Sequence, residues 1–325
     1  MTERLKELDY VKCLCIILMV IFHLAYFGDK YPYAKDIVYT FHMPAFLIIS
    51  GYLLNVSKPA REFEHRMIWI FIPYAIMEAA YIIASAFMPV RGGTGGTDNL
   101  SVWSSIQTIL FAPIGPYWYL HTLVICSTVH YLVFKMARRL SVTSRLILSG
   151  IALYVVSLAV KGISIDNALY ILAGAALKQT EIPFTKAFMP SRWSILAITV
   201  MCFDHTHLSK STVAGVIITW LAISFMLWTW GKTGSAIRKI CCTIGRNTLI
   251  ILVFSPAFTM LAKVYQKYFD FDPSGMLFMI SSTALCIAGC FAIAFAMDKL
   301  HMTRYMFGQS TILLAKKKTE PEAVQ

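Results

Sequence analysis

Apolar segments recur along almost the whole chain, and they limit its fold more than any other feature. We place them at residues 10–28, 37–55, 66–88, 116–136, 146–160, 165–180, 193–203, 213–230, 241–262 and 275–299. A spanning segment of about 20 residues must form a helix, because hydrocarbon leaves its backbone no water to bond. Only 14% of the residues are charged, against about 25% in soluble domains. The sequence therefore predicts an all-α, polytopic integral membrane protein with about ten transmembrane helices.

Basic residues fall mainly in alternate loops of this arrangement. With the N-terminus in the cytoplasm, Lys and Arg gather on the cytoplasmic side, at 58–66, 135–145, 178–192, 232–239 and 299–318. This pattern follows the positive-inside rule, so the net charge of +12 needs no nucleic-acid partner. We expect both termini in the cytoplasm and the chain in the cell (inner) membrane. Residues 1–314 would form one transmembrane domain, and 315–325 a polar cytoplasmic tail.

Two histidines lie inside the first two apolar segments. His23 and His42 both fall in the half of the membrane that this topology places outermost. Burying a polar group in hydrocarbon costs several kcal/mol unless it is paired, and imidazole moves protons near neutral pH. The pair therefore indicates one polar cavity with acid–base chemistry. The alternative is that each ring simply bonds a neighbouring carbonyl.

Other charged residues occupy the first and third segments. Lys12 shares a helical face with His23 about 16 Å away, and Asp9 is placed to pair with Lys12. The alternative for Lys12 is a topology anchor whose ammonium group snorkels to the membrane surface. Glu78, on the same segment as Arg66, is a carboxylate in mid-span that we expect to face the bundle interior. Its alternative is a structural pair with a buried Arg or Lys.

Aromatic residues open the fourth long segment. Trp118 and Tyr119 follow Gly115-Pro116, and they could bind substrate or form an ordinary interfacial belt. No cysteine spacing indicates zinc or a disulfide framework. His205 and His207 do not share a helix face, so we expect no metal.

Four blocks within roughly the first 125 residues share one resemblance: Asp9 to His23, Phe41 to Leu53, Arg66 to Tyr74 and Gly115 to Leu120. In this order they resemble the membrane acyltransferase-3 family, whose members O-acylate glycans and other surface molecules. The resemblance implies ten core helices, a cytoplasmic acyl-CoA donor, and an acceptor reached from the membrane or the outer face. It also implies a basic residue and a first-helix histidine with ten residues between them, which Lys12 and His23 match, although relatives more often carry Arg. Ser255 stands where relatives often have His before a proline.

Together these features give the hypothesis of a membrane O-acyltransferase. His23 would be the general base and His42 would assist it, while Lys12 and Arg66 would hold the phosphates of acetyl-CoA. Glu78, Trp118 and Tyr119 would bind a glycan or lipid-linked sugar acceptor, with membrane lipids as the surroundings. The alternative is a multi-span saccharide transporter or flippase that uses the His and Glu residues as a proton relay.

Overall fold

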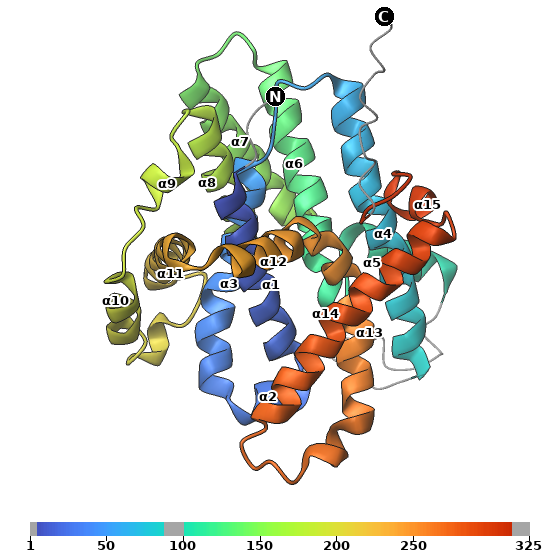
Figure 1. Cartoon of the computed structure of the whole chain (residues 1–325). Helices are drawn as coiled ribbons and strands as arrows, with labels where there is room; N and C mark the ends of the chain where they lie inside the picture. The colour runs from blue at the N-terminus through green and yellow to red at the C-terminus, as the bar shows by residue number, and fades with distance from the viewer. Residues whose placement is uncertain (1–4, 88–100, 314–325) are drawn as a thin grey trace, which may run out of the picture.

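The computed structural model describes residues 5–87 and 101–313 as a bundle of helices (Figure 1). These residues contain no β-strand, which confirms the all-α prediction. The predicted tail at 315–325 lies outside the described residues. The longer helices are α1 (Lys6–His23), α3 (Pro32–Tyr52), α4 (Ala60–Phe87), α6 (Trp118–Met136), α7 (Val142–Ala159), α8 (Ile165–Gln179), α11 (Val213–Lys232), α12 (Ser235–Arg246), α13 (Thr248–Tyr265) and α14 (Met276–Lys299). The shorter ones are α2 (Ala25–Lys30), α5 (Val102–Phe111), α9 (Phe184–Ala187), α10 (Ser194–Met201) and α15 (Thr303–Phe307), with 3-10 turns η2 (Gly115–Tyr117), η3 (His205–His207) and η4 (Gln266–Phe269).

Six segments of the described chain are long and apolar enough to cross a membrane. They are Ala60–Ala86, Val102–Met136, Val142–Ala159, Val213–Lys232, Thr248–Phe269 and Met276–Lys299. The expected count of ten spans is not confirmed. The first helix, α1, carries four charged residues in its first seven positions, and charge lowers the apolarity of a segment that would otherwise qualify.

Three predicted segments differ from the helices that form. The chain breaks at Leu24, which has extended backbone angles, so 10–28 is divided between α1 and α2. The segment 241–262 begins inside α12, and the membrane-length helix starts only after Asn247. Helix α10 has eight residues, or about 12 Å of rise, which is too short for a hydrocarbon core of about 30 Å.

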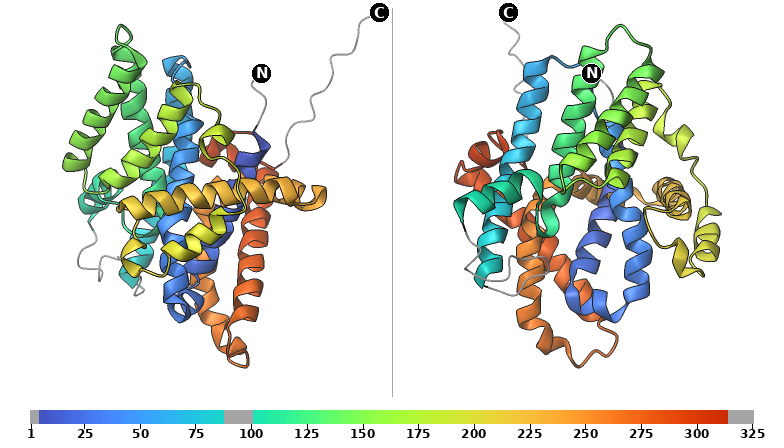
Figure 2. Two further views of the ribbon diagram at one scale, coloured as in Figure 1. Left: turned by 90° about the vertical axis from the view of Figure 1, so that its left-hand side faces the viewer. Right: turned by 180° about the vertical axis from the view of Figure 1, so that it is seen from behind.

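Helices α1 and α3 lie at the centre, where most other helices meet them (Figures 1 and 2). Helix α3 packs closely on α8, with Gly51 and Gly174 at the crossing. A Cβ atom at Gly51 would lie 2.0 Å from the Ile171 carbonyl oxygen, and one at Gly174 would lie 1.9 Å from that of Ile48. Small residues let membrane helices approach in this way, so the two glycines set the distance between α3 and α8.

Helix α11 is oriented differently from the central pair. Figure 1 shows α11 nearly end-on, and the left view of Figure 2 shows it lying across the other helices. It contacts α3, α1 and α10. As a result, the loop between α10 and α11 is brought beside the first half of α3, where Tyr33 and His205 have ring centroids 4.4 Å apart.

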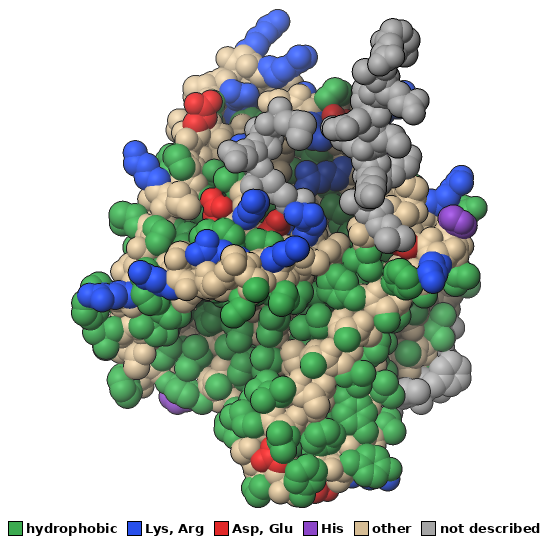
Figure 3. Space-filling view, in the orientation of Figure 1, with side chains coloured by type: hydrophobic (Ala, Val, Ile, Leu, Met, Phe, Trp, Pro, Cys, Tyr) green, Lys and Arg blue, Asp and Glu red, His purple; other side chains and the backbone are tan. Residues whose placement is uncertain are grey.

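Charged side chains are distributed unevenly over the surface. In Figure 3 the Lys and Arg side chains gather over α12 and over the end of the bundle that holds the α1 N-terminus. The lower part of this face is mostly apolar, and Asp or Glu side chains appear at its lower tip. On this face, basic side chains are therefore concentrated in the upper half, with a few charged side chains of both signs at the lower tip.

Candidate active site

A cavity of about 740 Å³ opens among α1, α3, α13 and the start of α6. Its wall includes His23 and Met19 from α1, and His42 and Tyr39 from α3. The α10–α11 loop supplies Leu208, Ser209 and Lys210. The two histidines expected to share a polar cavity therefore lie on one wall.

Each of these histidines is fixed by a backbone carbonyl one turn earlier in its own helix. His23 Nδ1 lies 2.7 Å from the Met19 carbonyl oxygen, and His42 Nδ1 lies 2.7 Å from that of Val38. A carbonyl oxygen can only accept, so Nδ1 carries the proton in both rings. In a neutral ring, Nε2 is then the basic atom.

The two rings differ in how they meet the cavity. The His23 side chain is exposed, although α1 is central to the fold. His42 is 2% exposed, and its Nε2 has no hydrogen-bond partner among the described residues. A buried polar atom is normally bonded. His42 Nε2 at a cavity wall is therefore an acceptor suited to a ligand or water.

Tyr39 lies between the histidines. Its ring centroid is 5.9 Å from that of His23 and 5.2 Å from that of His42. Its hydroxyl donates to the Phe22 carbonyl oxygen at 3.2 Å. Tyr39 thus ties the end of α1 to α3 and keeps the two imidazoles in a fixed relation.

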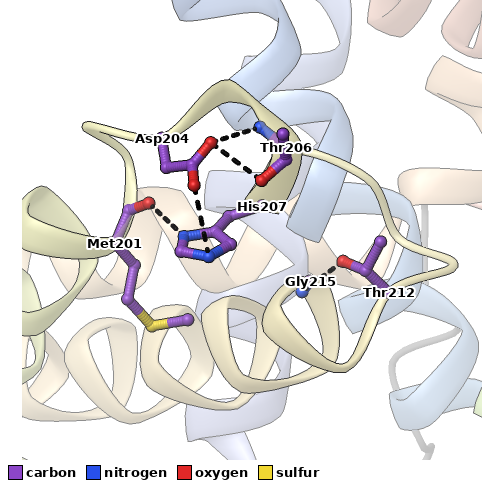
Figure 4. Close-up of polar contacts among 6 residues, drawn as sticks. All are labelled: Met201, Asp204, Thr206, His207, Thr212 and Gly215. Atoms are coloured by element: carbon purple, nitrogen blue, oxygen red, sulfur yellow. Dashed lines mark hydrogen bonds and ion pairs between the residues drawn. The ribbon is translucent and has the colours of Figure 1, made fainter.

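The α10–α11 loop is held by its own polar contacts (Figure 4). Asp204 accepts from the Thr206 backbone N–H at 2.9 Å and from the Thr206 hydroxyl at 2.8 Å. These bonds hold the pKa of Asp204 below its usual value. His207 lies 3.8 Å from Asp204 and bonds the Met201 carbonyl at 2.9 Å, and Thr212 caps α11. The loop therefore presents Lys210 from a defined backbone.

Lys210 is held on two sides. Its Nζ donates to Asn167 Oδ1 at 2.7 Å and lies 5.1 Å from the Trp118 ring centroid. Burial lowers the pKa of Lys210, and the charge of Asp166 opposes this effect. Lys35 and Lys263 also line the cavity, so three ammonium groups surround it.

A protein-family model described as an acyltransferase domain matches residues 5–295, which is most of the chain. The chain belongs to the acyltransferase-3 family. It is therefore a membrane acyltransferase, and the match extends well beyond the first 125 residues on which the sequence resemblance rested. No curated protein and no solved structure matches the chain.

Lys12 and Arg66 do not line the cavity of this acyltransferase. Lys12 pairs with Asp9 at 2.8 Å, as the sequence predicted, with the two side chains 15% and 5% exposed. Arg66 is exposed on α4 and forms no ion pair with a described residue. Both lie in the N-terminal parts of their helices.

Glu78 also lies outside the cavity wall. It is fully buried, and its Oε1 accepts from the Ile114 backbone N–H at 2.5 Å. The next two residues, Gly115 and Pro116, line the cavity. The carboxylate expected to bind substrate is therefore placed to position a segment of the cavity wall.

Replacing Glu78 by Ala is expected to reduce both stability and acyl transfer. The Ile114 N–H would lose its acceptor, at a cost of about 1–3 kcal/mol, and small displacements at an active site can lower rates strongly. Glu78→Gln keeps a carbonyl acceptor and should recover most of both properties. Thermal unfolding and initial rates test this, and equal losses in the Ala and Gln variants would contradict it.

The two predicted aromatic residues have different places in the acyltransferase. Trp118 lines the cavity, whereas the Tyr119 hydroxyl bonds Ser50 Oγ at 2.7 Å inside the helix packing. Ser255, which stands where relatives often have a histidine, also lines the cavity.

Lys35, Lys210 and Lys263 were not singled out from the sequence, because each lies just outside a predicted apolar segment, as ordinary loop lysines do. Asp36 is the carboxylate among the described lining residues, and it too was missed. No local sequence pattern indicates that the three lysines and Asp36 lie near the histidines. Within 5–87 and 101–313, no group of three or more His, Cys, Asp or Glu side chains could hold a metal ion.

Proposed function

We propose that this acyltransferase moves an acetyl or similar short acyl group from acyl-CoA to a hydroxyl group of a cell-surface or lipid-linked glycan. The main support is the pair of imidazoles that line the cavity. Each Nδ1 atom is bonded to a backbone carbonyl, so Nε2 is the basic atom of each ring. A general base must reach the proton that it removes. The cavity gives an acceptor hydroxyl access to His23.

The reaction is a direct transfer. His23 Nε2 takes the proton of the acceptor hydroxyl while that oxygen attacks the thioester carbonyl carbon. The resulting tetrahedral oxyanion collapses, the carbon–sulfur bond breaks, and the imidazolium returns its proton to the leaving thiolate. His42 Nε2 accepts a hydrogen bond from a second hydroxyl of the acceptor and so orients it.

The donor would enter from the opposite end of the molecule. Lys12 and Arg66, with neighbouring cations, would bind the phosphates of acetyl-CoA there, since ammonium and guanidinium groups bind phosphate strongly. The gathering of Lys and Arg over that end supports a cytoplasmic assignment for it. With this orientation in the cell (inner) membrane, the cavity would lie toward the outer face.

The test is acyl transfer by purified protein in lipid vesicles. With acetyl-CoA labelled in its acetyl group and extracted surface glycans as acceptors, we expect label in one glycan fraction and release of free CoA in equal amounts. Vesicles without the protein are the control. Saccharide flux across the vesicles without label incorporation would instead support the transporter hypothesis and contradict this proposal.

A further inference from the structure

We infer that the acceptor is anionic, and that Lys35, Lys210 and Lys263 bind its phosphate or carboxylate group while a hydroxyl faces His23. This inference rests on the proposed function and specifies its substrate class. The three lysines are the cationic side chains among the described residues that line the cavity.

The cavity wall carries an excess of positive charge. Three lysines and one carboxylate, that of Asp36, are among its described lining residues, which gives +3 and −1, or a net +2 with neutral histidines. Lysines gathered in a low-dielectric wall repel one another, and an anion relieves that repulsion. Lys35 has an ion-pair partner in Asp29, whereas a neutral sugar would leave Lys210 and Lys263 without a contacting anion among the described residues.

The ammonium group of Lys210 is held by two contacts with uncharged groups. Its bond at 2.7 Å is to the neutral amide oxygen of Asn167, and an ammonium group has three donors. The Trp118 ring lies 5.1 Å from Nζ and lines the same cavity. The head group is therefore oriented without being neutralised by direct contact with a carboxylate.

The other two lysines approach from different helices. Lys35, on α3, pairs at 3.3 Å with Asp29, which is not among the lining residues, and lies 5.8 Å from the Tyr39 ring centroid. Lys263, on α13, forms no ion pair with a described residue. The three ammonium groups thus come from α3, α13 and the α10–α11 loop, while the Tyr39 and Trp118 rings offer faces for a sugar ring.

The experiment measures binding by the full chain in detergent, by calorimetric titration. The probes are glucose 1-phosphate, glucuronate and glucose, at one ionic strength. We expect either anionic sugar, or both, to bind at least about tenfold more tightly than glucose, the effect of about one charge-assisted hydrogen bond. Comparing phosphate with carboxylate identifies which anion the subsite takes.

Variants locate the subsite. Lys210→Gln and Lys263→Gln should each weaken anionic-sugar binding about tenfold, whereas Lys267→Gln is the control, because Lys267 lies on η4 outside the cavity wall. Since Lys210 bonds Asn167, thermal unfolding checks its variant for folding, and the exposed Lys263 provides an independent result. Equal affinity for glucose and both anionic sugars would overturn the inference.

A last arm separates acceptor from donor. If the lysines serve the phosphates of CoA, then adenosine 3′,5′-bisphosphate will bind with the same sensitivity to Lys210→Gln, and the inference is wrong. Anionic-sugar binding without acyl transfer would contradict the proposed function and leave the subsite standing. Acyl transfer to a neutral glycan, with no binding of anionic sugars, would support the proposed function and overturn the inference of an anionic acceptor.

Discussion

Acyl transfer is expected to fall by about 10²–10⁴-fold when His23 is replaced by Ala, which is the usual contribution of a general base. The ring bonds the Met19 carbonyl and faces the cavity, so its removal leaves the apolar core intact. The measurement is the initial rate of label transfer from acetyl-CoA, together with the thermal unfolding midpoint. We expect the rate to collapse and the midpoint to stay nearly unchanged.

Two controls make this result specific to chemistry. His65→Ala removes an exposed imidazole on α4, outside the cavity, and should transfer at the wild-type rate. Added imidazole should restore part of the activity of His23→Ala, because the cavity of about 740 Å³ can admit it. An unimpaired His23→Ala enzyme would rule out the proposed base.

Gly174→Ala is expected to destabilise the fold by about 1–3 kcal/mol or more, as overpacking of a close contact does. The new Cβ would lie 1.9 Å from the Ile48 carbonyl oxygen. Both groups belong to helix backbones, so relief requires α3 and α8 to move apart. That movement would also displace His42, which is on α3. Unfolding of purified protein in detergent by heat or denaturant measures the loss.

Gly231→Ala is the matched control for this substitution. Gly231 is on α11, and nothing lies within 4 Å of the position where its Cβ would be. Replacing Gly by Ala in an open helical position stabilises by up to about 1 kcal/mol. The two variants should therefore shift the unfolding midpoint in opposite directions. Equal midpoints would show that the α3–α8 contact is looser than described.

Hydropathy located the helices better than it counted the spans. Each predicted segment overlaps a helix because apolar runs in a membrane protein must satisfy their backbone internally. Hydropathy does not report direction, however, so it could not show that α11 lies across the bundle (Figure 2). It also could not distinguish the eight-residue α10 from a crossing helix, nor locate the break at Leu24.

The histidines were predictable, and their surroundings were not. An imidazole in an apolar segment is unusual enough to be recognised alone, and two at matching depth indicated a common cavity. Lys35, Lys210 and Lys263 are ordinary loop lysines in sequence, and only the path of the chain brings them together. Glu78 was noticed for its burial, but its partner is the backbone N–H of Ile114, which no side-chain pattern encodes.

The bonds that orient the two imidazoles have a consequence for the tolerance of the site to mutation. Both acceptors are main-chain oxygens, at Met19 and Val38, and every amino acid carries that atom. Substituting either side chain therefore leaves the acceptor in place, as long as the helix persists. The proton therefore stays on Nδ1 of each ring whichever amino acid occupies the acceptor position. Only a change in the helical register would remove the acceptor.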